Sequence, residues 1–326
     1  MQIYNKEKAA WRMNTLASAR KPFVFLINYD MTECYVEEPA DIPPSELLYD
    51  FNGITNALPA RKYKGNFDWI THPVSYMEYK RSFDIVRQNI YAGNSFLTNL
   101  TCATPVVTNL SLREIFECSD AKYRLWMKNR FVVFSPEIFV RIHRGEISSY
   151  PMKGTINAAL PDARSCLLND KKELAEHATI TDLIRNDLSR IADKVTVKRY
   201  RYIDELQTNR GKLLQMSSEI TGRLPHDYLS SLGSRFFELL PAGSITGAPK
   251  CKTVSIIAEA ETYHRGFYTG VMGYFDGENL DSAVMIRFIE QTDNGLVFKS
   301  GGGITAQSDC QSEYEEMKQK VYVPIY

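Results

Sequence analysis

The stretch 270–300 reads GVMGYFDGENLDSAVMIRFIEQTDNGLVFKS. It contains three runs rich in aliphatic, β-branched and aromatic residues, at 270–275, 282–289 and 295–300. Asp276-Gly277 and Asp293-Asn294-Gly295 separate these runs, and such dipeptides between apolar runs are typical of tight hairpins. The stretch therefore predicts strands that pair in antiparallel fashion.

Upstream patterns add helices and further strands. The apolar spacing predicts helices near 75–92 and 171–192, and strands near 23–28, 131–134 and 138–142. Helices and antiparallel strands together favour an α+β fold over a doubly wound parallel sheet.

Composition excludes several function classes. The 326 residues include 44% apolar and 24% charged residues, and 39 Lys and Arg balance 39 Asp and Glu, which argues against a nucleic-acid partner. The longest apolar run, near 22–27, is too short to cross a membrane, so we expect a cytoplasmic protein without a membrane partner. The six cysteines show no zinc spacing and suit reduced, mostly buried thiols.

The Pro- and Gly-rich stretch 36–66 suggests irregular connections, with a short N-terminal subregion, 1–70, packed on a main body, 71–326.

A predicted hairpin brings a carboxylate and an amine together. Strands at 139–142 and 147–150 flank the sequence HRGE, and Glu137 and Lys153 each lie eight residues from Gly145. Folding the hairpin would place both side chains at its open end. Spacing alone leaves two interpretations open: a surface ion pair of small energetic value, or a positioned amine beside a carboxylate.

Two predicted helices each carry a pair of carboxylates on one face. Glu173 and Glu176 are i, i+3 neighbours on the first, whose apolar stripe is formed by residues 184, 188 and 191. The second helix, capped by Ser308 or Asp309, carries Glu313, Glu316 and Lys320. Paired carboxylates suit Mg²⁺, but two solvated acidic faces explain the pattern equally well.

Glycine-rich stretches predict close backbone approach to a small anion. The sequence PAGSITGAPK fails the phosphate-loop pattern because Ala248 stands where glycine is required, and GGGITA, from Gly301, is followed by too few residues for a dinucleotide-binding unit. The remaining interpretation is a flexible backbone that can donate N–H groups to a small anionic ligand.

These motifs together resemble the chorismate-utilising enzymes, and within them the component I chains of aminodeoxychorismate synthases. The resemblance runs from about 76 to 322, in order through NSFLTNLT, SPEIFV, PMKGTI, AEHATITDLIRNDL, LPAGSITGAPK, GYF, AVMIRFI and GGGITAQSDCQSEYEE. It implies an α+β fold in which large antiparallel sheets pack as a sandwich with flanking helices. It also implies a buried cleft that binds chorismate and Mg²⁺.

The resemblance assigns site residues position by position. It implies that Glu176 and Glu316 hold Mg²⁺, with Glu173 and Glu313 behind them. The residues that it assigns to substrate binding are Asn99, Thr155, Gln215, Thr246, Gly247, Tyr274, Arg287, Gly302, Gly303 and Lys320. Arg287 is also notable on its own, because an arginine in an otherwise apolar run needs an anion.

Lys153 is the position at which the resemblance separates reactions, because aminodeoxychorismate synthases have lysine there and anthranilate synthases usually have alanine. The resemblance implies that Lys153 attacks C2 of chorismate and that Glu137 moves the protons. Ammonia would then give 4-amino-4-deoxychorismate, an intermediate of 4-aminobenzoate and folate biosynthesis. Because the chain has no glutaminase signature, a partner amidotransferase would deliver that ammonia from glutamine. The alternatives are anthranilate synthase component I, another chorismate enzyme, or a non-catalytic binding module.

Two positions bear on these alternatives. Isochorismate and salicylate synthases have a general-base lysine where this chain has Leu97, which argues against addition of water at C2. Gln215 stands where the family usually has histidine, and glutamine cannot exchange protons at neutral pH. Glu137 is therefore the preferred general acid.

Overall fold

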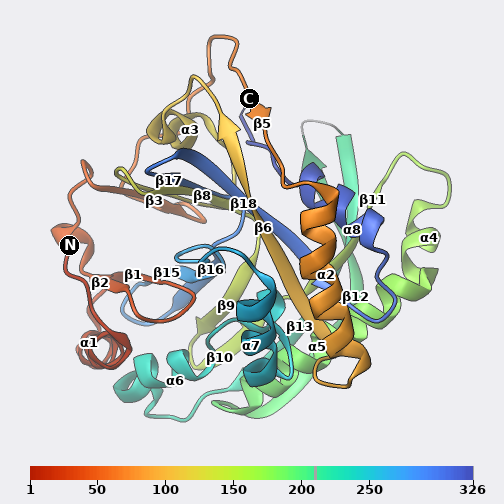
Figure 1. Ribbon diagram of the computed structural model, residues 1–326. Helices are drawn as coiled ribbons and strands as arrows, with labels where there is room; N and C mark the ends of the chain where they lie inside the picture. Colours follow the sequence, from red (N-terminus) through yellow and green to blue (C-terminus); the bar gives the residue numbers. More distant parts are fainter. Residues whose placement is uncertain (209–210, 326) are drawn as a thin grey trace.

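The computed structural model describes residues 1–208 and 211–325 and contains two large antiparallel sheets with helices around them (Figure 1). The first sheet has nine strands in the order β11-β13-β10-β9-β16-β15-β1-β2, with β12 paired to β13. Its strands are β1 (Phe23–Ile27), β2 (Cys34–Glu37), β9 (Ile138–His143), β10 (Glu146–Ser149), β11 (Met152–Asn157), β12 (Asp193–Thr208), β13 (Gly211–Arg223), β15 (Val271–Phe275) and β16 (Leu280–Val284).

The second sheet also has nine strands, in the order β14-β6-β18-β17-β8-β7-β3-β4, with β5 paired to β6. Its strands are β3 (Leu47–Phe51), β4 (Ile54–Thr55), β5 (Ile70–Thr71), β6 (Leu97–Val107), β7 (Tyr123–Met127), β8 (Phe131–Ser135), β14 (Gly247–Ala248), β17 (Phe288–Thr292) and β18 (Gly295–Ile304).

Helices cover both sheets. They are α1 (Lys6–Ser18), α2 (Tyr76–Tyr91), α3 (Leu112–Cys118), α4 (Ala163–Asn169), α5 (Lys171–Ser189), α6 (Leu232–Glu238), α7 (Lys250–Ala260) and α8 (Cys310–Gln319), with 3-10 turns at Pro39–Asp41, Tyr228–Ser231 and Gly243–Ile245. One apolar cluster joins residues of both sheets, including Phe131, whose ring stacks on Phe267 and Phe288 at 5.0 and 4.9 Å. Other clusters bury α1, α5 and α6 on the first sheet, and α2, α7 and α8 on β6 and β18.

Local signals in the sequence correspond closely to these elements. Ser75 caps α2 with a full capping box, and Asp309 caps α8 by accepting from the Ser312 N–H. The stripe Ile184, Leu188 and Ile191 at the end of α5 and just beyond it is buried, as predicted. Hairpins form at both predicted C-terminal turns, β15 with β16 and β17 with β18.

The run 282–289, predicted as one strand, is two strands in different sheets. β16 ends at Val284 and pairs with β9, whereas β17 begins at Phe288 and pairs with β8. Arg287 lies in the break with a left-handed φ of 52°, a conformation that interrupts a strand. The prediction was wrong here because both halves are apolar and the local pattern carries no sign of the change of sheet.

The crossing at 285–287 is the second of two, and the first lies beside it but earlier in the chain. Between β8 and β9 the chain passes from the second sheet to the first through Pro136 and Glu137. The Phe134 N–H donates to the Arg287 carbonyl at 3.2 Å, and the Val284 N–H donates to the Glu137 carbonyl at 3.1 Å. The two crossings therefore support each other and place Glu137 and Arg287 at the junction of the sheets.

The N-terminal segment 1–70 contributes strands to both sheets. β1 pairs with β15 in the first sheet, and β3 pairs with β7 in the second. These pairings place strands of the segment in both sheets, and β3 lies within the stretch predicted to be irregular. The cysteines are all free thiols, and only Cys166 and Cys251 are exposed. None of the helices in the described part of the chain is long and apolar enough to span a membrane.

Candidate active site

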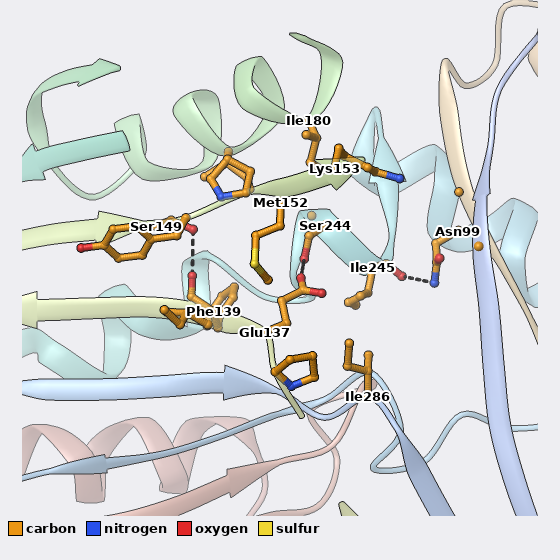
Figure 2. A pocket seen from close by; sticks show the side chains of 18 of the residues that line it. Asn99, Glu137, Phe139, Ser149, Met152, Lys153, Ile180, Ser244, Ile245 and Ile286 are labelled. Carbon is orange, nitrogen blue, oxygen red and sulfur yellow. Dashed lines mark hydrogen bonds between the residues drawn. The ribbon is translucent and has the colours of Figure 1, made fainter. Parts of the chain in front are cut away.

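A cavity of about 320 Å³ opens where the two sheets meet. Its walls come from the start of β6, the 136–140 crossing, β11, α5, the 243–247 segment, the second crossing, β18 and α8. The predicted site residues that line it are Asn99, Glu137, Lys153, Thr155, Gln215, Gly247, Arg287, Gly302, Gly303, Glu316 and Lys320. Segments far apart in the sequence thus meet around one space, part of which is shown in Figure 2.

Glu137 enters the cavity from the first crossing. Its Oε1 accepts a hydrogen bond from the Ser244 hydroxyl at 2.7 Å (Figure 2). Burial raises the pKa of the Glu137 carboxyl above its usual range, against the lowering effects of Ser244 and of the nearby Lys153, Arg287 and Lys320. A carboxyl with a raised pKa is suited to giving and taking protons near neutral pH.

Lys153 enters from β11 and, among the described residues, forms no ion pair with Glu137, which was one of the two interpretations of the hairpin spacing. Its Nζ lies 3.3 Å from Glu176 Oε2 on α5. The predicted hairpin does form, with β9 paired to β10, but β11 then pairs with β13 instead of extending that hairpin. Both Glu137 and Lys153 therefore face the cavity without touching, and a ligand could lie between them.

The second carboxylate helix reaches the cavity through Glu316 and Lys320. Lys320 Nζ lies 2.7 Å from Glu316 Oε1 and donates to the Gly301 carbonyl at 2.8 Å. Glu313 is buried and accepts from the Ser308 hydroxyl at 2.8 Å. A Cβ on Gly302 would lie 3.2 Å from Glu313 and 3.8 Å from Glu316, so this strand passes directly against both carboxylates.

Arg287 lies at the second crossing and lines the cavity. Its Nε is buried and has no hydrogen-bond partner in the described part of the chain, while its guanidinium lies 5.4 Å from the centre of the Tyr322 ring. A buried donor without a partner is costly unless a ligand supplies one. The arrangement therefore favours an anionic ligand beside Arg287, as the apolar run around it predicted.

The glycine-rich strand β18 borders the same space. A Cβ on Gly303 would lie 3.0 Å from the Leu97 side chain and 3.5 Å from Lys153 Nζ. Any side chain at this position would therefore occupy the space in front of Lys153. Glycine keeps the backbone accessible to a ligand there.

The remaining predicted substrate-binding residues occupy different places. Thr155 and Gln215 are register partners on β11 and β13, and both line the cavity. Thr246 is fully buried next to lining residues and donates to the Ala242 carbonyl at 2.8 Å. Tyr274 does not line the cavity but packs against the apolar cluster between the sheets, because it lies opposite Asp281, towards the end of β15 that is further from the second crossing.

Three of the lining residues that sequence reasoning missed bear on the site. Tyr268, which is buried and lies six positions before Tyr274, borders the cavity, as does Tyr150. Ser244 lies in the motif that was identified, but its bond to Glu137 joins distant segments and has no local signal. Asp187 lines the cavity and accepts from Lys250 at 2.8 Å, which ties α5 to the start of α7.

The carboxylates at the cavity meet some of the requirements of a site for a hard divalent cation. Among the residues that the structure describes, no three His, Cys, Asp or Glu side chains group as a metal site. However, Mg²⁺ in proteins often uses one or two carboxylates, with water and the bound ligand completing its coordination. Glu316 faces the cavity, and Glu176 lies against the cavity lysine Lys153, so the donor chemistry for such a site is present.

Comparisons with known proteins identify the family of the chain. A family model described as chorismate binding enzyme matches residues 12–325. An uncharacterized PabA-like protein from Haemophilus influenzae is 48% identical over 316 residues, which cover 96% of this chain and 95% of that protein. Anthranilate synthase component 1 from Acetivibrio thermocellus is 32% identical over 268 residues, covering 77% of this chain and 53% of that protein.

A solved structure shares the fold. The menaquinone-specific isochorismate synthase MenF from Escherichia coli has a TM-score of 0.74 at 16% identity, covering 98% of this chain and 82% of that one. This similarity confirms the predicted α+β sandwich. With the family model matched over almost the whole length, the chain belongs to the chorismate-binding enzymes.

Proposed function

We propose that this enzyme aminates chorismate at C4 with ammonia and gives 4-amino-4-deoxychorismate, a step towards 4-aminobenzoate and folate. The observation that carries the proposal is Lys153, an amine on the cavity wall with the Glu137 carboxyl facing the same space. Two positively charged side chains that line other walls, Arg287 and Lys320, support a dianionic substrate such as chorismate.

In the proposed reaction the Lys153 Nζ, in its neutral form, forms a bond to C2 of chorismate. The ring double bonds shift, and the C4–O bond breaks as Glu137 gives its proton to the leaving hydroxyl, which departs as water. Ammonia then bonds to C4, the double bonds shift back, and the bond between Lys153 and C2 breaks. Glu137 takes up a proton from the incoming ammonia, which restores the starting state.

The other residues bind and orient the substrate in this proposal. Arg287 and Lys320, with the backbone of Gly302 and Gly303, hold the enolpyruvyl carboxylate. Asn99, Thr155, Gln215, Thr246 and Gly247 surround the ring. Mg²⁺, held by Glu176 and Glu316 with Glu173 and Glu313 behind them, would neutralise the ring carboxylate. Tyr274 lies away from the cavity, so Tyr268 takes the place that was first given to it.

The identity of the product tests the proposal. The purified chain is incubated with chorismate, Mg²⁺ and ammonium, and the products are identified by chromatography and mass spectrometry. We expect 4-amino-4-deoxychorismate without release of pyruvate. Anthranilate with pyruvate as the main products would contradict it and support the alternative, anthranilate synthase, to which the 32% identical relative points.

The ammonia source is tested separately. We propose a partner amidotransferase subunit, because the cysteines lack a nucleophile motif and glutamine would need a second chain to release its amide. The homogeneous chain should use ammonium and not glutamine. Glutamine hydrolysis by the isolated chain would contradict this part alone and leave the amination proposal standing.

A further inference from the structure

Arg265 holds two cavity-lining segments together without lining the cavity itself. It lies between α7 and β15 and is 3% exposed. Its Nη2 donates to the Asn99 carbonyl at 2.7 Å, and its Nη1 donates to the Ile245 carbonyl at 2.9 Å. Asn99 belongs to β6 and Ile245 to the 243–247 segment, and both line the cavity. One guanidinium thus bridges two walls of the site.

A buried counter-charge fixes the guanidinium. Glu261 accepts from Arg265 at 2.6 and 2.9 Å, and both side chains are 2% exposed. The same carboxylate accepts from the Thr101 N–H and hydroxyl at 2.9 and 2.7 Å, which ties the pair to β6. Tyr29 covers the other side, with its ring centre 4.8 Å from the guanidinium carbon. Such a pair is held in one geometry by contacts on all sides.

The segment that Arg265 fixes also carries the partner of Glu137. Asn99 donates from its side chain to the Ile245 carbonyl at 3.0 Å and from its N–H to the Thr246 carbonyl at 2.9 Å. Ser244, immediately before Ile245, donates to Glu137. A displacement of Ile245 would therefore move Ser244 and Asn99 together.

We propose that Arg265 is a positioning residue for the active site. It sets the 243–247 segment against β6, and so fixes Asn99 on the substrate and Ser244 on Glu137. The inference rests on the proposed function only in naming chorismate as the ligand. The local positioning of the segment is independent of the substrate.

A second buried arginine provides a matched control. Arg124 is 5% exposed, donates to the carbonyls of Phe116 and Ser119 at 3.3 and 2.7 Å, and pairs with Asp50 at 2.5 Å. It therefore makes the same kinds of contact as Arg265. None of its partners lines the cavity.

The experiment compares Arg265→Lys with Arg124→Lys. Lysine keeps the positive charge against the carboxylate but cannot reach both carbonyls as the planar guanidinium does. Both variants should melt at lower temperature. Only Arg265→Lys should show faster hydrogen–deuterium exchange at 97–99 and 243–247. Only this variant should also bind chorismate more weakly, by about tenfold, as expected when Asn99 is displaced and its hydrogen bond to the substrate is lost. Unchanged exchange and affinity in Arg265→Lys, despite a lower melting temperature, would overturn the proposal.

Two further arms keep the test decisive. If Arg265→Lys does not fold, the double variant Arg265→Gln with Glu261→Gln removes both buried charges and is measured in the same way, with the same two outcomes. Wild-type protein is titrated with chorismate first. Failure of the wild type to bind would count against the proposed function, whereas the exchange comparison would still decide the role of Arg265.

Discussion

Two of the lysines that line the cavity, Lys153 and Lys320, have nearly equal exposure but are held very differently. The side chains of Lys153 and Lys320 are 27% and 26% exposed. Lys320 makes two short contacts, to Glu316 and to the Gly301 carbonyl at 2.7 and 2.8 Å. Lys153 makes one longer contact among the described residues, 3.3 Å to Glu176. The comparison supports the proposed roles, in which Lys320 is a fixed cation for binding and Lys153 approaches the ligand and reacts.

The difference follows from the elements that carry the two lysines. Lys320 caps α8 and pairs with Glu316 one turn earlier on that helix, so the pair forms within one element. Lys153 comes from β11, and its carboxylate partner comes from α5. Any ligand or cation that engages Glu176 would therefore change the surroundings of Lys153 directly.

The largest effect is expected for Lys153→Ala. Loss of a positioned nucleophile should lower the rate of C4 amination by at least about a thousandfold, because bulk ammonia lacks the effective concentration of a bound amine. Chorismate affinity should change little, since Arg287 and Lys320 remain. Steady-state kinetics and calorimetric titration measure the two quantities. Full C4 amination by the variant would assign Lys153 an electrostatic role only.

Next is Glu316→Ala, which removes one proposed metal carboxylate. Turnover should be abolished while the melting temperature stays close to that of the wild type. Glu315→Ala is the matched control, because Glu315 precedes it on α8 and pairs at the surface with Lys318. Near-normal activity of the Glu316 variant in the presence of EDTA would show that the metal assignment is wrong.

A smaller effect is expected for Lys320→Ala. The variant should bind chorismate more weakly by about 2 kcal/mol, or roughly thirtyfold, since a charge-assisted contact to a carboxylate is lost. The rate at saturating chorismate should fall much less than in Lys153→Ala. An equal loss in both variants, with unchanged affinity, would remove the distinction between the two lysines.

The smallest effect concerns stability. Because the pKa of Glu137 is raised in the folded state, ionisation of Glu137 costs stability at pH values above its usual 4.5. Glu137→Gln should therefore melt higher than the wild type at pH 7, and the gain should shrink as the pH falls towards 4.5. Melting curves across this pH range provide the measurement. Glu146→Gln, on the exposed start of β10, should show no such gain, and a gain for Glu137→Gln that persisted unchanged at low pH would contradict the raised pKa.

Local sequence signals predicted much of the fold. The capping residues Ser75 and Asp309 and the turns after Phe275 and Thr292 act over a few residues, so their effect can be read directly. The change of sheet at Arg287 could not be predicted in this way. It depends on which strands pair with each half of the run 282–289, and that pairing involves β8 and β9, about 150 residues earlier in the chain.

The candidate site also combines local features that the sequence predicts with long-range contacts that it does not. Lys153, Glu137 and Arg287 come from motifs that are recognisable one at a time, and the structure brings all three to one cavity. The contact of Ser244 with Glu137 and the bridge made by Arg265 join segments that only the folded chain brings together. Tyr274 and Tyr268 illustrate the same limit, because both lie in an apolar stretch and only the position of the crossings decides which one faces the cavity.

The central claim is that Lys153 is the less constrained lysine and bonds to the substrate. Intact-protein mass spectrometry after incubation with chorismate and Mg²⁺, without ammonia, tests it most directly. We predict a chorismate-derived adduct on the wild type, mapped by peptide digestion to Lys153, that persists in Lys320→Ala at high chorismate and is absent from Lys153→Ala. An active wild-type enzyme that forms no adduct, or an adduct that maps to another residue, would contradict the account.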